Sequence, residues 1–177
     1  MKFILPLLFA SAVASSQFVA KKGFDQETRS PFVTVNVAAA AKFNNTDAIV
    51  ADKPVYLSIT SSRYKAEGVE YSTYTANFRF DNLPDGTCLK TYDGKLTLVF
   101  EDGIEAPLSQ TSPTDCGEHA NIYIGGYSVF QMDVDQLKQS NLKKIILSTE
   151  KGPLEFSIKP DKAKTIKSSV VLLDATK

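Results

Sequence analysis

Most of the motifs on which enzyme chemistry depends are missing from this sequence. It contains one histidine, His119, and no serine stands in the G-x-S-x-G turn that exposes a nucleophile. It also lacks a phosphate-binding glycine loop, a dinucleotide glycine fingerprint and a zinc-binding helix motif. We therefore expect no cofactor. We also expect a non-catalytic protein rather than an enzyme. The alternative is a hydrolase with a carboxylate site, because paired carboxylates meet only in the folded chain.

The sequence also lacks a long apolar run. A membrane-spanning helix needs about 20 apolar residues in a row, so we expect no ordinary transmembrane anchor. A short apolar run at residues 3–10 follows Lys2 and precedes the small-residue pattern at residues 12–14. This order is typical of a secretory signal peptide, cleaved after Ala14 or, as a second choice, after Ser16. We expect residues 1–14 to be the signal peptide and the mature protein to be periplasmic or secreted.

The chain has no excess of charge of either sign, with 20 basic and 20 acidic residues. This balance gives no bulk attraction to nucleic acid or anionic membranes, so neither is an expected partner. The distribution is less even. Residues 81–118 carry eight acids against two lysines, and residues 138–167 carry eight lysines against three acids. Solvated loops and faces explain this pattern, and a dipolar molecule that associates head to tail is the alternative.

Cysteine is scarce, with only Cys88 and Cys116. An even count in an exported chain favours a disulfide between the two. A metal site is the alternative, because Asp115, Glu118 and His119 lie beside Cys116. Their spacing fits no common zinc pattern, and oxidation competes with thiolate ligands outside the cytoplasm. We therefore predict the disulfide and no metal.

The length and the hydrophobic content of 43% fit one globular domain, which we place at residues 53–177. Residues 15–52 give a weaker signal, and residues 38–41 are compatible with a helix. A first strand in this segment is indicated by the alternating residues Val33, Val35 and Val37.

The clearest strand signals lie in residues 87–108. The Asp93-Gly94 pair favours a two-residue hairpin loop, which would pair Leu89 with Leu98. A three-residue loop at residues 101–103 keeps apolar residues opposite one another in the next pair of strands. We expect three antiparallel strands whose buried face consists of Leu89, Leu96, Leu98, Phe100, Ile104, Ala106 and Leu108.

Alternating apolar residues predict further strands at residues 55–59, 69–80 and 120–124. The first two would be joined by a polar connection at residues 61–68, and Gly125-Gly126 would interrupt the third. The side chains that we expect to face the core are Val55, Leu57, Ile59, Tyr74, Ala76, Phe78, Phe80, Ile122 and Ile124.

The last third of the chain contains helix signals. Asp133 is a typical N-cap residue, and Gln136 follows three residues later as in a capping box. A hairpin of residues 144–149 and 154–158 comes next. Pro160 then suits the first turn of a second helix, whose apolar side would consist of Ala163, Ile166, Val170 and Leu173.

The sequence resembles small exported β-rich proteins of unknown function from the Bacteroidota. The likeness covers residues 87–173 and consists of turn and capping patterns. They are the strand at residues 96–100, the Asp102-Gly103 turn, the D-x-D-Q-L helix start, the strand at residues 143–149 and the Lys-Gly turn before residues 154–156. The resemblance implies an exported bacterial protein and carries over no functional residue.

We predict a mainly β fold: an antiparallel β-sandwich or bent sheet of about seven to nine strands with one or two short helices. The alternative is an α+β fold with the C-terminal helix packed on a sheet. For function, we expect an exported binding or structural module whose ligand is a protein or a glycan. Outward-facing residues rich in tyrosine, threonine and asparagine suit such ligands. The predicted binding residues are Tyr56, Tyr71, Thr73, Thr75, Asn77, Asn121 and Tyr123.

Overall fold

The computed structural model describes residues 20–26, 30–44, 52–88, 95–119, 121–149 and 152–175. The predicted signal peptide therefore lies outside the described residues. In chain order the elements are β1 (Ala20–Asp25), β2 (Ser30–Asn44), β3 (Asp52–Ala66), β4 (Val69–Phe80), β5 (Leu96–Phe100), β6 (Glu105–Gln110), β7 (Tyr123–Val129), α1 (Gln131–Gln139), β8 (Leu142–Thr149), β9 (Gly152–Ile158) and α2 (Pro160–Ala175).

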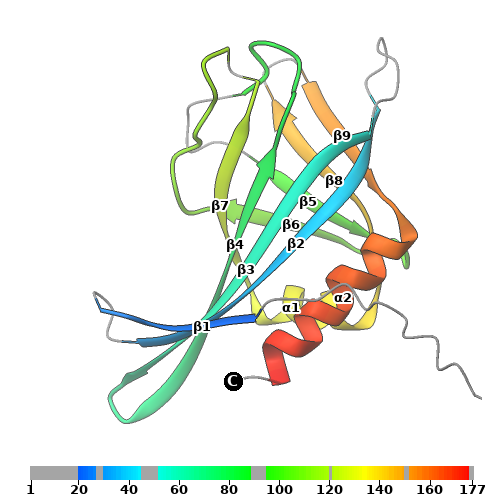
Figure 1. Cartoon of the computed structure of the whole chain (residues 1–177). Coiled ribbons are helices and arrows are strands. Elements are labelled where there is room, and N and C mark those ends of the chain that lie inside the picture. Colours follow the sequence, from blue (N-terminus) through cyan, green and yellow to red (C-terminus); the bar gives the residue numbers. More distant parts are fainter. Residues whose placement is uncertain are drawn as a thin grey trace, which may run out of the picture.

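The strands form a single antiparallel sheet in the order β1-β2-β3-β4-β7-β6-β5-β8-β9. The sheet bends so strongly that β9 also pairs with β2, and the two helices lie beside it (Figure 1). This confirms the mainly β prediction in its bent-sheet form. The apolar faces of the strands enclose one common core.

The N-terminal part of the sheet is longer than the sequence indicated. The predicted first strand is present as β2, and the helix compatible with residues 38–41 is wrong, because these residues continue that strand. One edge of β2 pairs with β3. The other edge pairs with β1 near its start and with β9 at its end, so β2 links the two ends of the sheet.

The hairpin of β3 and β4 is also longer than predicted. The polar connection expected at residues 61–68 is wrong, since β3 continues to Ala66. The chain reverses through Glu67 and Gly68, whose φ angles are 52° and 83°. Two-residue hairpin loops need such left-handed angles, which glycine adopts without steric cost. The far end of this hairpin, with β1 and the start of β2, extends away from the rest of the sheet (Figure 1).

Strand β5 has different neighbours from those expected. The predicted pairing of Leu98 with Ala106 across β5 and β6 is confirmed. The predicted pairing of Leu98 with Leu89 is wrong, because the other edge of β5 pairs with β8, where Leu98 lies opposite Ile145. Leu89 and the Asp93-Gly94 loop themselves lie outside the described residues.

The three-residue loop between β5 and β6 forms as predicted. Gly103 has a φ of 87°, and the N–H of Phe100 donates to the carbonyl of Ile104 over 2.9 Å. The side chain of Ile104 is nevertheless 49% exposed rather than buried. It lies at the loop end of the hairpin, beyond the edge of the core.

Strand β7 is turned over relative to the prediction. It runs through Gly125 and Gly126 without interruption, and Tyr123 is 1% exposed, whereas Ile122 and Ile124 are half-buried. A side chain on Gly125 would begin 2.8 Å from the Tyr123 ring. The missing side chain of Gly125 thus leaves the space that the buried tyrosine ring fills.

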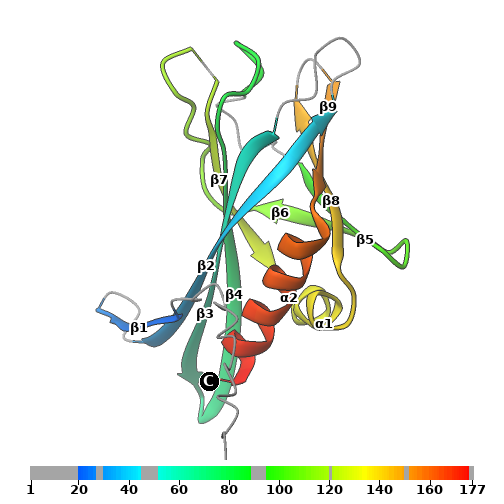
Figure 2. The same cartoon turned by 45° about the vertical axis from the view of Figure 1, so that its right-hand side comes forward.

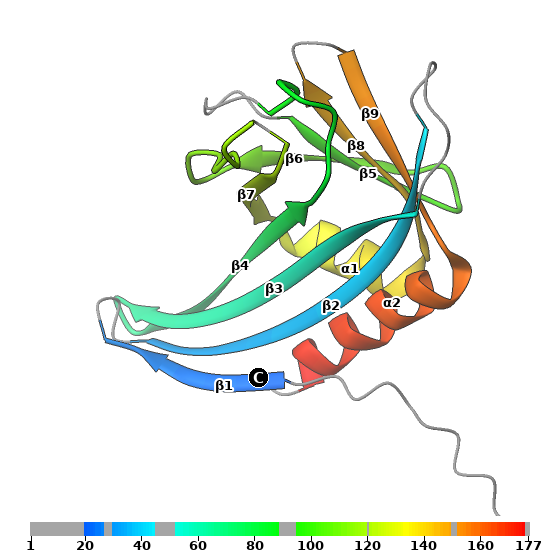
Figure 3. The same cartoon turned by 45° about the horizontal axis from the view of Figure 1, so that its top comes forward.

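Helix α1 begins two residues before the predicted N-cap residue. The carboxylate of Asp133 accepts a hydrogen bond from the N–H of Phe130 over 2.9 Å, so Asp133 closes the first turn from within the helix. In α2 the predicted apolar side is confirmed as buried. Helix α2 contacts β2, β3 and β8, with α1 beside it (Figures 2 and 3).

Candidate functional site

The outward side of the β3–β4 hairpin is the most distinctive surface in the described part of the chain. Strand alternation turns ten of its side chains away from the core. Together they form the outer face: Tyr56, Ser58, Thr60, Ser62, Tyr64, Tyr71, Thr73, Thr75, Asn77 and Arg79. All of these residues are exposed or half-buried. The outer face is therefore a strip of hydroxyl and amide groups with aromatic residues at both ends.

At the far end of the strip, Tyr64 and Tyr71 lie directly opposite each other on the two strands. Their rings are stacked, with centroids 5.3 Å apart and an interplanar angle of 17°. Stacking holds each ring in place and leaves the outward surface of the pair open to solvent. The pair is a fixed apolar platform beside polar neighbours.

At the other end, the guanidinium of Arg79 lies 6.0 Å from the centre of the Tyr56 ring. Its Nε donates to the Asp81 carboxylate over 2.7 Å. This hydrogen bond raises the pKa of Arg79 above its ordinary value. Arg79 and Asp81 thus form a largely exposed ion pair at this end of the strip.

A hollow of about 410 Å³ lies at the far end of the outer face. This distal hollow is lined by Asp25, Ser30, Ser62, Tyr64 and Thr73. Its volume falls within the range of about 300–1,000 Å³ typical of small-ligand sites. Its lining residues carry one aromatic ring, one carboxylate and four hydroxyl groups, one of which is the phenol of Tyr64.

Strand pairing explains how these residues meet. Asp25 and Ser30 are partners at the end of the β1–β2 pair, and Ser62 and Thr73 are partners on β3 and β4. Tyr64 lies one step further along the same face of β3 than Ser62. Ser30 is 2% exposed, so it contributes little surface to the hollow.

The predicted binding residues are only partly brought together. Five of them lie on the outer face, and Thr73 also lines the distal hollow. Asn121 is half-buried in the loop before β7, where its carbonyl accepts the N–H of Leu83 over 2.8 Å. The outward orientation predicted for Tyr123 is wrong, because this residue packs in the core and its hydroxyl bonds that of Tyr127.

Four residues of the distal hollow were missed in the sequence. Tyr64 and Ser62 fall in the segment that was expected to be a connection between strands. Extending the alternation of β3 by four residues beyond Thr60 would have found them. Asp25 and Ser30 carry no such signal. Their position depends on the pairing of β1 with β2, in a segment whose periodicity is weak.

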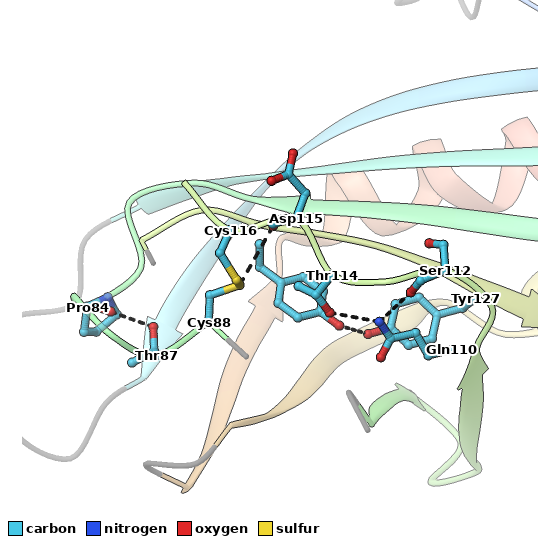
Figure 4. The surroundings of a disulfide bond; sticks show 10 residues. Pro84, Thr87, Cys88, Gln110, Ser112, Thr114, Asp115, Cys116 and Tyr127 are labelled. Carbon is cyan, nitrogen blue, oxygen red and sulfur yellow. Dashed lines mark hydrogen bonds between the residues drawn. A yellow bond between two sulfur atoms is a disulfide. The ribbon is translucent and has the colours of Figure 1, made fainter. Parts of the chain in front are cut away.

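Two alternative chemistries find little support in the described residues. Cys88 and Cys116 form the predicted disulfide, with Cα atoms 5.8 Å apart (Figure 4). No group of His, Cys, Asp and Glu side chains within the described ranges could hold a metal ion. Of the acids beside the β5–β6 turn, Glu101 accepts from Asn141 and Asp102 from Gln136. These two carboxylates attach the turn to α1 and the residues after it.

The fold and the outer face define a mainly β protein with an open, hydroxyl-rich surface and a hollow at its end. Comparisons with protein-family models, with curated proteins and with solved structures find no match for the chain. Among the helices that the structure describes, none has the length and apolar character needed to cross a membrane.

Proposed function

We propose that the protein is an exported, non-catalytic module that binds a glycan at the distal hollow. The observation that carries this proposal is the lining of the hollow, which consists of a tyrosine, an aspartate, two serines and a threonine. Sugars present apolar C–H surfaces beside many hydroxyl groups. A binding site for them therefore needs aromatic surface together with hydrogen-bonding groups that can both donate and accept.

Each group has a role in this proposal. The Tyr64 ring takes the apolar face of one sugar ring, and the stacked Tyr71 ring keeps Tyr64 in its bound orientation. Such preorganisation lowers the entropy lost on binding. The carboxylate of Asp25 accepts hydrogen bonds from sugar hydroxyls, and hydrogen bonds to a charged group are stronger than those between neutral groups.

The rest of the outer face makes an extended glycan more suitable than a single sugar. Tyr56 and Tyr64 are eight residues apart on one strand, which corresponds to about 27 Å. Hydroxyl and amide side chains occupy the interval, among them Ser58, Thr60 and Thr75. A chain of several sugar units bound at the distal hollow could continue along these groups.

The compartment is part of the same proposal. The signal-peptide pattern of residues 1–14 and a disulfide both fit a protein that works outside the cytoplasm. The resemblance to exported Bacteroidota proteins agrees with this placement. A hydrolase is less well supported, because Asp25 is the one carboxylate among the described residues that line the hollow, whereas most glycosidases use two.

A glycan-array screen of the mature protein, followed by titration of the best ligand, tests the proposal. Tyr64→Ala and Asp25→Asn should each weaken binding about tenfold, which corresponds to about 1.4 kcal/mol. Tyr56→Ala is the matched control, because Tyr56 lies on the same face of the same strand with nearly the same exposure, 41% against 42% for Tyr64. The control should retain most of the affinity for a short ligand.

Two results would count against the proposal. One is a screen without any glycan ligand. The other is a ligand whose affinity is the same in Tyr64→Ala and in the unmodified protein. Turnover of a bound polysaccharide that disappears in Asp25→Asn would instead support the hydrolase.

A further inference from the structure

The same strands carry a second hollow on their opposite face. This cationic hollow has a volume of about 290 Å³, and its lining includes Lys22, Pro31, Val33, Ser61 and Arg63. These five of the seven lining residues alternate along their strands with those of the outer face, and the other two, Gly23 and Phe32, are their neighbours in sequence. The two hollows therefore lie on opposite sides of the sheet.

Ser61 is the first sign that this hollow accepts a ligand. Its side chain is buried, at 3% exposure, and its hydroxyl has no hydrogen-bond partner among the described residues. Nearly all buried polar side chains in native proteins have such a partner. A ligand atom in the hollow that Ser61 lines would supply the missing one.

The charge around the hollow indicates the sign of that ligand. Lys22 and Arg63 line it, and a smaller adjoining hollow shares Arg63 and adds Lys65 and Glu70. Glu70 is the one acid among these described residues. Its carboxylate lies 3.5 Å from a terminal nitrogen of Arg63, longer than the roughly 2.7–2.9 Å of a charge-assisted hydrogen bond. The surroundings are thus net positive, and the guanidinium is not tightly held by Glu70.

We propose that the cationic hollow binds an organic carboxylate with an apolar body. The planar guanidinium of Arg63 matches the two oxygens of a carboxylate, and the Ser61 hydroxyl donates to one of them. Pro31 and Val33 provide apolar surface for the rest of the ligand. This lining disfavours inorganic phosphate, because charged oxygens that face apolar walls lose their hydration without compensation.

Benzoate is a suitable probe, with benzamide as a neutral molecule of nearly the same shape. Each compound is titrated into the folded mature protein, and calorimetry measures the heat of binding. Benzoate should bind, and benzamide should not. Arg63→Gln should weaken benzoate binding about tenfold, and Ser61→Ala should weaken it about fivefold. The control is Arg79→Gln, which removes another carboxylate-paired arginine from the outer face and should leave benzoate binding unchanged.

A free acid and the C-terminus of a peptide share this chemistry. A peptide that ends in phenylalanine, compared with its C-terminal amide, separates the two sources: tighter binding than benzoate assigns the hollow to chain ends, and weaker binding assigns it to small acids. Either result supports the carboxylate site, provided that the amide does not bind.

Several outcomes would overturn the inference. They are equal binding of benzoate and benzamide, an affinity unchanged in both Arg63→Gln and Ser61→Ala, or tighter binding of inorganic phosphate than of benzoate. Ser61→Ala removes a buried hydroxyl without a partner and should fold normally, so a folding defect in Arg63→Gln would still leave one informative variant. Glycan binding at the distal hollow should be the same in both variants, which keeps the two proposals separately testable.

Discussion

Reduction of the Cys88–Cys116 disulfide should destabilise the protein by about 3.6 kcal/mol at 25 °C. The two cysteines are 28 positions apart, so the bond closes a loop of 29 residues. The entropy that the unfolded chain regains when such a loop opens gives this value. With a denaturant dependence of about 2 kcal/mol per molar urea, the unfolding midpoint should fall by roughly 1.8 M.

The folded structure should survive reduction, which makes the magnitude measurable. The two loops that the disulfide joins are also held by backbone hydrogen bonds, from Leu83 to Asn121 over 2.8 Å and from Gly86 to His119 over 3.1 Å. The disulfide should therefore act mainly on the unfolded chain. Urea unfolding with and without a phosphine reductant measures the effect.

A double variant provides the control for this measurement. In Cys88→Ala/Cys116→Ala the reductant should change nothing, and the midpoint should lie near that of the reduced protein. The same midpoint for the oxidised and reduced forms of the unmodified protein would refute the loop-entropy reasoning. So would two titratable thiols in the protein before reduction.

Two further predictions concern the aromatic core. Gly125→Ala should lower the free energy of unfolding by about 1–3 kcal/mol, because the added methyl would lie 2.8 Å from the Tyr123 ring in a packed interior. The control Ser128→Ala, on the outward side of β7, should lower it much less. Equal urea midpoints for the two variants would contradict this prediction. Burial, and then the hydrogen bond to Tyr123, raise the pKa of Tyr127 above its ordinary value of 10.0, so the folded state keeps a proton that the unfolded chain releases. Stability should be intact below pH 10 and should fall above it by up to about 1.4 kcal/mol per pH unit, with a smaller slope in Tyr127→Phe; equal slopes would argue against a protonated, buried Tyr127.

The parts of the fold that the sequence predicted correctly are those that depend on local pattern. The alternation from Tyr74 to Phe80 and the apolar side of α2 both follow from the period of a single element. The loop around Gly103 follows from the turn chemistry of glycine. In each case the residues that decide the structure lie close together in the chain.

The errors arose where distant residues decide. The neighbour of β5 is β8, more than 40 positions further along the chain, and no local pattern distinguishes this strand from one nearby. The orientation of Tyr123 depends on its packing against the distant Phe80 of β4, with the ring centroids 5.9 Å apart. Alternation of side chains along β7 is compatible with burial of either face. Here the less apolar Tyr123 is buried, and the more apolar Ile124 is half-buried.

The candidate site was found only in part for the same reason. The outer face follows from alternation on β3 and β4, and half of its ten residues were among the predicted binding residues. The distal hollow also needs Asp25 and Ser30, which reach it through the pairing of β1 with β2. That pairing has no turn or periodic signal strong enough to predict it.

The most direct test of glycan binding at the distal hollow is a backbone NMR titration of the labelled mature protein with the best ligand from the glycan array. We expect the largest shift changes at Asp25, Ser62, Tyr64 and Thr73, smaller changes at their sequence neighbours and along the outer face, and none in β5 and β8, which do not line the hollow. Changes confined to residues outside the outer face, or no saturable change with any glycan, would contradict the proposed site.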